Sequence, residues 1–495
     1  HYLKRPYTLV PQAASAMPRL VYLDKNSRVL PENAPAERVA YSVYEIHLKP
    51  DLKYQPHPAF ARDVQGRLEY HGLNRNEISK RYSLNDFAHS GTRNVTAADY
   101  VYQIKRLVHP AIHTPIGGLM GDYIVGLKEY AATLQQAQQA NPGRFLDLND
   151  YPLPGVEVVD THTYRIKVYG KYPQFAYWLA MPFFSPMPFE AEQFYAQEGM
   201  QQNNLTLDWW PVGSGPYYLS ENNPNQRMVL TRNPNFSVET YPAEGEPGDR
   251  EAGLLDDAGK PLPLIDKAVF TLEKETIPYW NKFLQGYYDA AGISSDSFDQ
   301  AVSMSVGGEA NVSAEMRAQG ISLSTSVATS THYMGFNFLD ATVGGDSERA
   351  RKLRRAIAIA VDYEEFVSIF ANGRGVSAQS PIPPGIFGYR EGEAGLNRYV
   401  YDWVNDAPKR KSIAEAKRLL HEAGYPNGLD EKTGSPLVIY LDTTATGVGS
   451  KSRIDWLRWP ATKTPSVKTA ASTGDTHVEK KTTTAVITDS SRNVR

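Results

Sequence analysis

The chain has 495 residues, of which 41% are hydrophobic and 22% charged, and this composition indicates a soluble globular protein with two or three domains and excludes a single small module. Its net charge of -3 at pH 7 provides no overall positive field for a nucleic-acid backbone. The sequence has no cysteine, which excludes disulfides, thiolate catalysis and cysteine-ligated metal sites.

The first half of the chain shows mainly strand signals. Apolar and polar residues alternate within residues 38–48, which predicts a half-buried strand that Pro50 ends. Thr96 and Asp99 have the spacing of a capping box, which predicts a helix start, and apolar residues follow at helical intervals. Two hairpins are expected, one over residues 155–168 and one over residues 217–231.

A Gly-, Pro- and acid-rich segment separates these hairpins from the rest of the chain. Residues 238–264 have the composition of an exposed loop, and residues 267–272 resume strand character. The most apolar stretch, residues 175–189, contains three prolines and is too short to span a membrane. We therefore expect a soluble protein.

Helix and strand signals alternate in the second half. Residues 331–338 are aromatic and predict a strand, and residues 437–441 predict another. Helices are expected to begin at residues 346–348, at Asp362 and at Ser412, because each position carries a capping residue followed by an apolar stripe. Together these signals indicate an α/β or α+β protein.

The last segment differs in composition from everything before it. From Pro460 to Arg495 the chain is rich in Ser and Thr and contains no Leu, Phe, Tyr, Trp or Met. Such a segment buries too little apolar area to offset the entropy of ordering it. We predict that this tail is disordered.

No arrangement of residues in the sequence supports catalysis or metal binding. Gly213-Ser214-Gly215 resembles a nucleophile elbow only loosely, and Pro216 after it has no N–H for an oxyanion hole, so a tight turn is the better interpretation. His109 and His113 have a spacing found in metal sites, but Pro110 lies between them and no acidic partner accompanies them. We expect no enzyme activity, no cofactor and no metal.

Several segments, in order, resemble signatures of the family 5 extracellular solute-binding proteins of bacterial ABC importers, oligopeptide-binding type. The first-lobe signatures are matched by residues 95–107, 155–160, 211–217 and 232–236. The second-lobe signatures are matched by residues 333–338, 353–362, 375–383 and 416–425. The order of these motifs makes the resemblance far more specific than any one of them.

The resemblance implies an α/β, two-lobed periplasmic-binding-protein fold (type II, cluster C-like) with an extra subdomain in lobe one. We place this subdomain in residues 1–153, the hinge-side part of lobe one in 154–275, an incomplete lobe two in 276–457 and the disordered tail in 458–495. The family's first strands would lie before His1, and the tail replaces the stretch that closes lobe two in the family.

The resemblance also implies a function. The protein would be the extracytoplasmic, periplasmic substrate-binding component of an ABC importer, with its signal peptide removed, either soluble or lipid-anchored. It would capture an oligopeptide or similar solute between the two lobes, as a monomer, and deliver it to a permease in the inner membrane, without nucleic acid. Two alternatives remain open, a hydrolase and a non-transport holdase or scaffold on the same fold.

Six residues are the best candidates for ligand contacts. The aromatics would form flat walls for variable side chains, and the asparagine would pair with a peptide unit, although packing in the core is an open alternative for each aromatic. The six candidates are Trp209, Trp210, Ser214, Tyr217, Tyr333 and Asn337.

Overall fold

The computed structural model describes residues 8–236, 239–274, 276–293, 297–304, 310–325, 329–443 and 451–457, with short segments at 468–470, 486–489 and 492–494. The chain divides into two compact units, His1–Leu272 and Glu273–Arg495. This division lies close to the boundary that the sequence predicts between residues 275 and 276.

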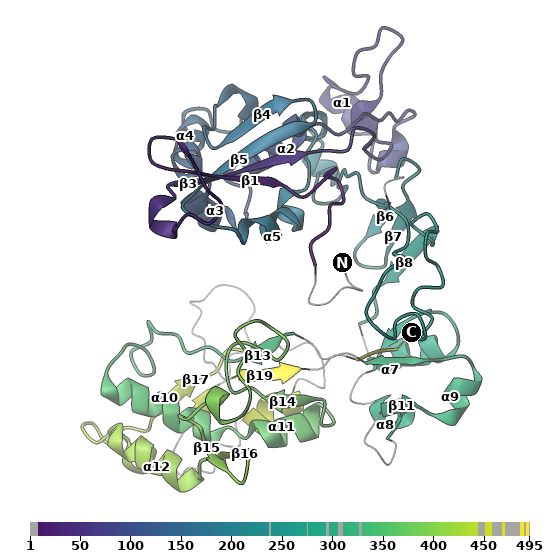
Figure 1. Ribbon diagram of the computed structural model, residues 1–495. Helices are drawn as coiled ribbons and strands as arrows, with labels where there is room; N and C mark the ends of the chain where they lie inside the picture. Colours follow the sequence, from purple (N-terminus) through teal and green to yellow (C-terminus); the bar gives the residue numbers. More distant parts are fainter. Residues whose placement is uncertain are drawn as a thin grey trace. The chain divides into compact units, whose positions relative to one another are not determined.

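Unit one contains a five-stranded antiparallel sheet in the order β2-β1-β3-β5-β4 (Figure 1). Its strands are β1 (Arg19–Leu23), β2 (Val29–Leu30), β3 (Tyr41–His47), β4 (Val156–Asp160) and β5 (Thr163–Tyr169). The alternation predicted within residues 38–48 is that of β3, where Ser42, Tyr44 and Ile46 are buried and the residues between them are half-buried. The predicted β4–β5 hairpin is confirmed.

This sheet crosses the position at which the sequence analysis divides lobe one. β5 pairs with β3 from Tyr41–Tyr169 to His47–Thr163, so strands from before and after Leu153 form one sheet. Backbone pairing across such a sequence distance leaves no local signal in the sequence. The subdomain boundary expected between residues 153 and 154 therefore does not separate two sheets.

Two helices, α2 (Ala97–Arg106) and α3 (Gly117–Tyr123), pack against this sheet. The other helices of unit one are α1 (Arg75–Ile78), α4 (Leu127–Ala140), α5 (Phe175–Leu179) and α6 (Phe189–Tyr195). The capping box predicted at Thr96 and Asp99 is present at the start of α2. The core between helices and sheet includes Tyr44, Ile46, Ile104, Leu127, Ile166, Phe175 and Phe194.

The rest of unit one is built on a three-stranded antiparallel sheet. It consists of β6 (Tyr217–Asn223), β7 (Arg227–Arg232) and β8 (Lys267–Thr271), which confirms the second predicted hairpin and the strand expected at residues 267–272. The described residues between β7 and β8 form turns and bends, as expected for a loop.

Unit two is also built of helices and short strands. Its helices are α7 (Thr276–Leu284), α8 (Phe298–Ala301), α9 (Ala314–Ala318), α10 (Glu348–Ala360), α11 (Tyr363–Phe370) and α12 (Ile413–Glu422). Its strands up to residue 443 are β9 (Ala291–Gly292), β10 (Val302–Met304), β11 (Ala310–Val312), β12 (Leu323–Thr325), β13 (Thr331–Tyr333), β14 (Gly375–Ser377), β15 (Tyr401–Val404), β16 (Ala407–Arg410) and β17 (Val438–Tyr440).

The helix starts predicted in unit two are confirmed by their capping bonds. The side chains of Ser347, Asp362 and Ser412 each accept a hydrogen bond from the backbone N–H three residues later. Gly373, just after the end of α11, has a positive φ of 71° and donates its N–H to the carbonyl of Val367. Capping is a local property, so it can be identified from the sequence.

The strand predicted at residues 331–338 is shorter than expected. β13 ends at Tyr333, and Asn337 begins a turn, because its side-chain oxygen accepts the N–H of Leu339 at 2.9 Å. The backbone N–H of Leu339 therefore bonds to the nearby Asn337 side chain rather than to a neighbouring strand.

Three short strands lie within the segment for which the sequence predicts disorder. β18 (Lys468–Ala470) pairs with β17, β19 (Val486–Asp489) pairs with β13 and β14, and β20 (Arg492–Val494) pairs with β12 and β9. Strand pairing uses backbone groups, so it does not require large apolar side chains. The remainder of residues 458–495 lies outside the described part of the chain.

Candidate functional site

The four candidate residues of unit one lie on one segment, residues 209–217, which leads into β6. Asn222 of β6 donates its side-chain N–H to the carbonyl of Trp209 at 2.6 Å. Asn233, at the end of β7, donates to the carbonyl of Gly215 at 2.9 Å. The β6–β7 hairpin therefore holds both ends of the segment.

Gln55 fixes the middle of this segment. Its backbone N–H donates to the carbonyl of Gly213 at 2.9 Å, and its side-chain oxygen accepts the N–H of Gly213 at 3.0 Å. The amide nitrogen of its side chain also donates to the carbonyl of Pro211 at 3.1 Å. The Gln55 side chain is 3% exposed, so these bonds satisfy a polar group that would otherwise be buried without partners.

A buried histidine and tyrosine hold the carbonyl of Trp210. Nδ1 of His57 accepts the N–H of Ala59 at 3.0 Å, so Nε2 carries the ring proton and donates it to the hydroxyl oxygen of Tyr195 at 2.8 Å. The Tyr195 hydroxyl donates in turn to the carbonyl of Trp210 at 2.7 Å. Burial lowers the pKa of His57 to about 3, so the imidazole is neutral.

The structure separates the roles of the two tryptophans. Trp210 is 7% exposed and belongs to the core of unit one, whereas Trp209 is half-buried and packs against that core. Core packing, the alternative interpretation of the aromatics, therefore describes Trp210. Ser214 and Tyr217 are half-buried, and the Tyr217 hydroxyl donates to the carbonyl of Ile265 at 2.8 Å.

There is room beside the turn for a ligand to approach the backbone. A Cβ atom added to Gly215 would meet no atom of the described residues within 4 Å. A Cβ on Gly213 would meet only the N atom of Gly215 at 3.9 Å and Oε1 of Gln55 at 4.0 Å, both ordinary contacts. The glycines are therefore not needed to avoid a clash inside unit one, and their missing side chains leave the backbone accessible.

The other two candidates belong to unit two. Tyr333 is the last residue of β13 and is 70% exposed. Asn337 is half-buried, and its side-chain oxygen is used in the turn with Leu339. The exposed ring of Tyr333 fits a contact surface, whereas the turn occupies one of the two groups that Asn337 would need for a bidentate peptide contact.

The polar residues that hold the segment carry little signal in the sequence. In Tyr54-Gln55-Pro56-His57-Pro58, Gln55 precedes a proline and His57 lies between two, and both are buried. Polar side chains in an otherwise apolar, proline-rich stretch are the only local signal. Their partners, Gly213 and Tyr195, are more than a hundred residues away, so the contacts themselves could not be predicted.

A second buried polar network supports the same region. Arg93 makes paired hydrogen bonds of 2.7–2.8 Å to Asp99 and of 2.7 Å to Glu190, and its guanidinium lies 5.1 Å from the ring centre of Tyr54. Burial alone would raise the pKa of Glu190, but the bonds from Arg93 outweigh it and lower that pKa. This network links the start of α2 to α6 in the core.

The described residues contain no group of three or more His, Cys, Asp or Glu side chains arranged to hold a metal ion. His109, considered above for metal binding, instead accepts the N–H of Ala111 on its Nδ1 atom at 3.1 Å. None of the helices in the described part of the chain is long and apolar enough to cross a membrane.

Comparison with known proteins identifies relatives for this fold. The model of the bacterial extracellular solute-binding proteins, family 5 (middle) matches residues 88–455. The chain is 23% identical over 399 residues to the periplasmic oligopeptide-binding protein OppA of Salmonella typhimurium, covering 80% of this chain and 59% of OppA. It is 25% identical over 284 residues to the heme-binding protein A of Haemophilus influenzae, covering 56% of this chain and 41% of that protein.

Solved structures show the same fold. The periplasmic binding protein DppA of Helicobacter pylori, in complex with the peptide STSA, matches with a TM-score of 0.53 and 15% identity over 93% of this chain and 68% of DppA. The murein tripeptide binding protein MppA of Escherichia coli matches with a TM-score of 0.52 and 16% identity over 91% of this chain and 68% of MppA. These likenesses confirm the predicted α/β, type II periplasmic-binding-protein fold.

These relatives are named as binding proteins rather than enzymes. The chain spans less than two thirds of the length of the curated relatives it matches. The family model nevertheless covers well over half of this chain, and the matched residues 88–455 contain all the motifs identified in the sequence. The chain belongs to the family 5 bacterial extracellular solute-binding proteins.

Proposed function

We propose that this chain is the substrate-binding component of an ABC importer, acts outside the cytoplasm, and captures an oligopeptide or a similar solute for a membrane permease. The family match over residues 88–455 carries this proposal. A relative named for oligopeptide binding and a structural neighbour solved with a bound peptide support it. The proposal involves no covalent chemistry and no cofactor.

Within this function, the open space beside the Gly213-Ser214-Gly215 turn would admit the main chain of a peptide. Trp209 and Tyr217 flank the turn as half-buried aromatic surfaces, and Trp210 supports it from the core. On unit two, Tyr333 offers an exposed ring, and Asn337 is proposed as a polar contact. A flat aromatic surface beside an open glycine turn suits a ligand whose main chain is constant and whose side chains vary.

Thermal unfolding in the presence of ligands tests the proposal. A bound ligand stabilises the folded state by RT ln(1 + [L]/Kd), which is about 2.7 kcal/mol at a hundredfold excess over Kd. We expect a defined tri- to pentapeptide pool to raise the melting temperature, with free amino acids as the matched control. Haemin is added in a separate set of unfolding measurements, because one relative is named for heme binding.

Mass spectrometry of the peptides after incubation distinguishes binding from hydrolysis. A binding protein returns every peptide intact, whereas a hydrolase shortens them. Stabilisation by haemin alone would replace the peptide with a tetrapyrrole as the proposed solute, and no stabilisation by any arm would contradict capture of either solute by this chain.

A further inference from the structure

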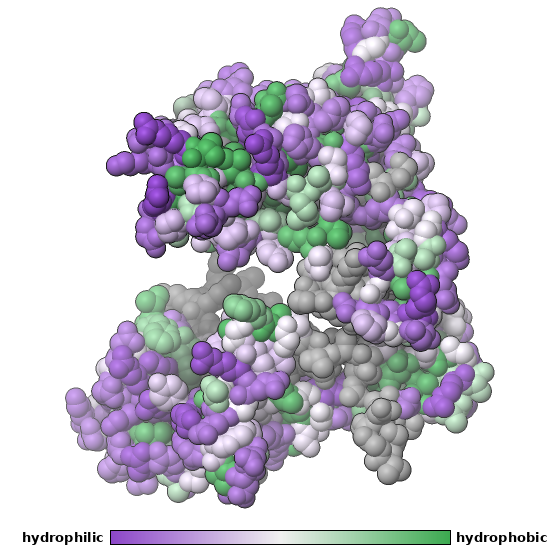
Figure 2. Space-filling view, in the orientation of Figure 1, coloured by the Kyte–Doolittle hydropathy of each residue, from purple (hydrophilic) through white to green (hydrophobic). Residues whose placement is uncertain are grey.

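The outer face of the five-stranded sheet in unit one carries a hollow of about 340 Å³. That volume is at the lower end of the range for small-molecule sites, about 300–1,000 Å³. In the surface view, hydrophobic residues gather over one end of this sheet, next to hydrophilic ones (Figure 2). The hollow is lined by Arg19, Val21, Leu23, Val43, Glu45, Pro154, Gly155, Val156, Glu157, Arg165 and Lys167.

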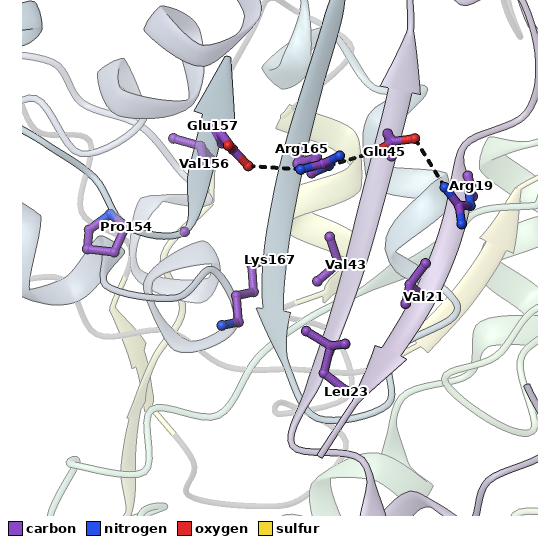
Figure 3. A pocket seen from close by; sticks show the side chains of 11 residues that line it. Arg19, Val21, Leu23, Val43, Glu45, Pro154, Val156, Glu157, Arg165 and Lys167 are labelled. Carbon is purple, nitrogen blue, oxygen red and sulfur yellow. Dashed lines mark hydrogen bonds and ion pairs between the residues drawn. The ribbon is translucent and has the colours of Figure 1, made fainter. Parts of the chain in front are cut away.

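One border of the hollow is a row of alternating charges across four strands. The register places Arg19 opposite Glu45, Glu45 opposite Arg165, and Arg165 opposite Glu157. The ion pairs between neighbours are 3.7, 2.7 and 3.3 Å long, and Figure 3 shows the four side chains in line. Two positive and two negative side chains balance each other, so this row attracts neither sign of ligand strongly.

The next row of side chains along the strands is apolar on β1 and β3 and basic on β5. Val21 lies opposite Val43, and Val43 lies opposite Lys167. Leu23 extends the apolar surface on β1, and all four side chains line the hollow (Figure 3). Half-buried aliphatic residues on the outer face of a sheet provide a floor for an apolar group.

Lys167 is the one charge of this hollow that no acidic residue balances. No carboxylate among the described residues forms an ion pair with it, and its ammonium lies 4.0 Å from the ring centre of Tyr41. A cation–π contact leaves the ammonium charged and able to donate to a further partner. The charged lining residues are therefore three basic and two acidic, with the excess charge beside the apolar floor.

We propose that this hollow binds a small amphipathic carboxylate, with the aliphatic chain on Val21, Leu23 and Val43 and the carboxylate on Lys167. The apolar floor disfavours a fully hydrophilic anion such as acetate, since nothing would cover the valines. The lysine disfavours an alkyl ammonium, because two cations would lie together. The site lies on a sheet face with its strand pairs already formed, so a peptide strand added to an edge would not occupy it.

Methyl-labelled protein provides a direct test, with octanoate as the probe, titrated to the concentration at which it forms micelles. We expect the methyl resonances of Val21, Val43 and Leu23 to shift saturably with octanoate. Octanol has the same chain without the charge, and acetate has the charge without the chain, so both should bind more weakly. Absence of saturable shifts at these methyls, or equal binding of octanol and octanoate, would overturn the proposal.

Lys167→Met separates the charge from the shape of the hollow, because methionine keeps an unbranched stem over Tyr41. We expect octanoate binding to weaken by about threefold to fivefold, the size of an exposed ion pair, while octanol binding is unchanged. Lys128→Met is the matched control, since Lys128 is exposed on α4 and does not line the hollow. Equal octanoate affinity in the Lys167 variant and the wild type would contradict the assignment of the carboxylate to Lys167.

Discussion

At the scale of single residues, the polar side chains that shape the candidate site are buried in unit one rather than displayed on its surface. Gln55 and His57 have no access to a ligand, yet they hold the backbone at Trp210 and Gly213. A ligand that docks against this turn would therefore depend on groups that it never touches. Such groups act through position, and their loss affects folding and binding together.

Trp210→Ala is expected to destabilise unit one by about 3–5 kcal/mol, because it removes a buried aromatic side chain from the core. Urea unfolding measures this loss. Trp209→Ala is the matched control, and we expect a smaller loss because Trp209 is only half-buried. A Trp210 variant that unfolds at the wild-type urea concentration but binds peptide more weakly would instead make Trp210 a ligand contact.

His57 makes the stability of unit one depend on pH. Its pKa is about 3 in the folded protein, below its ordinary value, so the unfolded chain takes up a proton first as the pH falls. The contribution of neutral His57 to the free energy of unfolding is fully present above the unfolded pKa of about 6.5. It decreases by about 1.4 kcal/mol per pH unit as the pH falls toward about 3. The loss arises because burial disfavours the imidazolium in the folded protein, whereas the unfolded chain accepts the proton freely.

His57→Gln isolates this effect, since an amide side chain does not titrate. We expect the urea stability of wild type to decrease more steeply than that of the variant between about pH 6.5 and about pH 4.5. The other histidines with lowered pKa, His71 and His109, are present in both proteins and cancel in the comparison. Parallel pH profiles would show that His57 is not the titrating group.

At the scale of secondary-structure elements, helix starts can be predicted from neighbouring residues, whereas contacts across a sheet depend on the register of its strands. The helix starts at Ser347, Asp362 and Ser412 depend on a side chain and an N–H three residues away, so the sequence identifies them. The row of charges across β1, β3, β5 and β4 depends on register between strands that are distant in sequence. Taken one at a time in the sequence, these residues cannot be distinguished from ordinary surface charges.

At the scale of the whole molecule, each unit has hydrophobic cores of its own. The large core of unit one ends at Val212, and two separate clusters, around Leu353 and around Trp280, belong to unit two. Domains with separate cores do not have to unfold together. A ligand that contacted both units would couple their unfolding.

We therefore expect calorimetry of the ligand-free chain to resolve more than one unfolding transition. Addition of a peptide that contacts both units should bring the transitions closer together, because such a ligand binds fully only while both are folded. A control peptide that does not bind should leave the separation unchanged. A single two-state transition without ligand would contradict independent cores.

The sequence by itself determined the α/β class, the helix caps, both hairpins of unit one and, through ordered motifs, the family. These properties depend on residues close together in the chain, where propensity, capping and turn chemistry act. The tertiary structure decided that Trp210 is a core residue, that Gln55 and His57 hold the candidate turn, and that Lys167 lies beside an apolar floor with its charge unbalanced. Burial and cross-strand register join residues more than a hundred positions apart, and no local pattern of side chains encodes which distant residues meet.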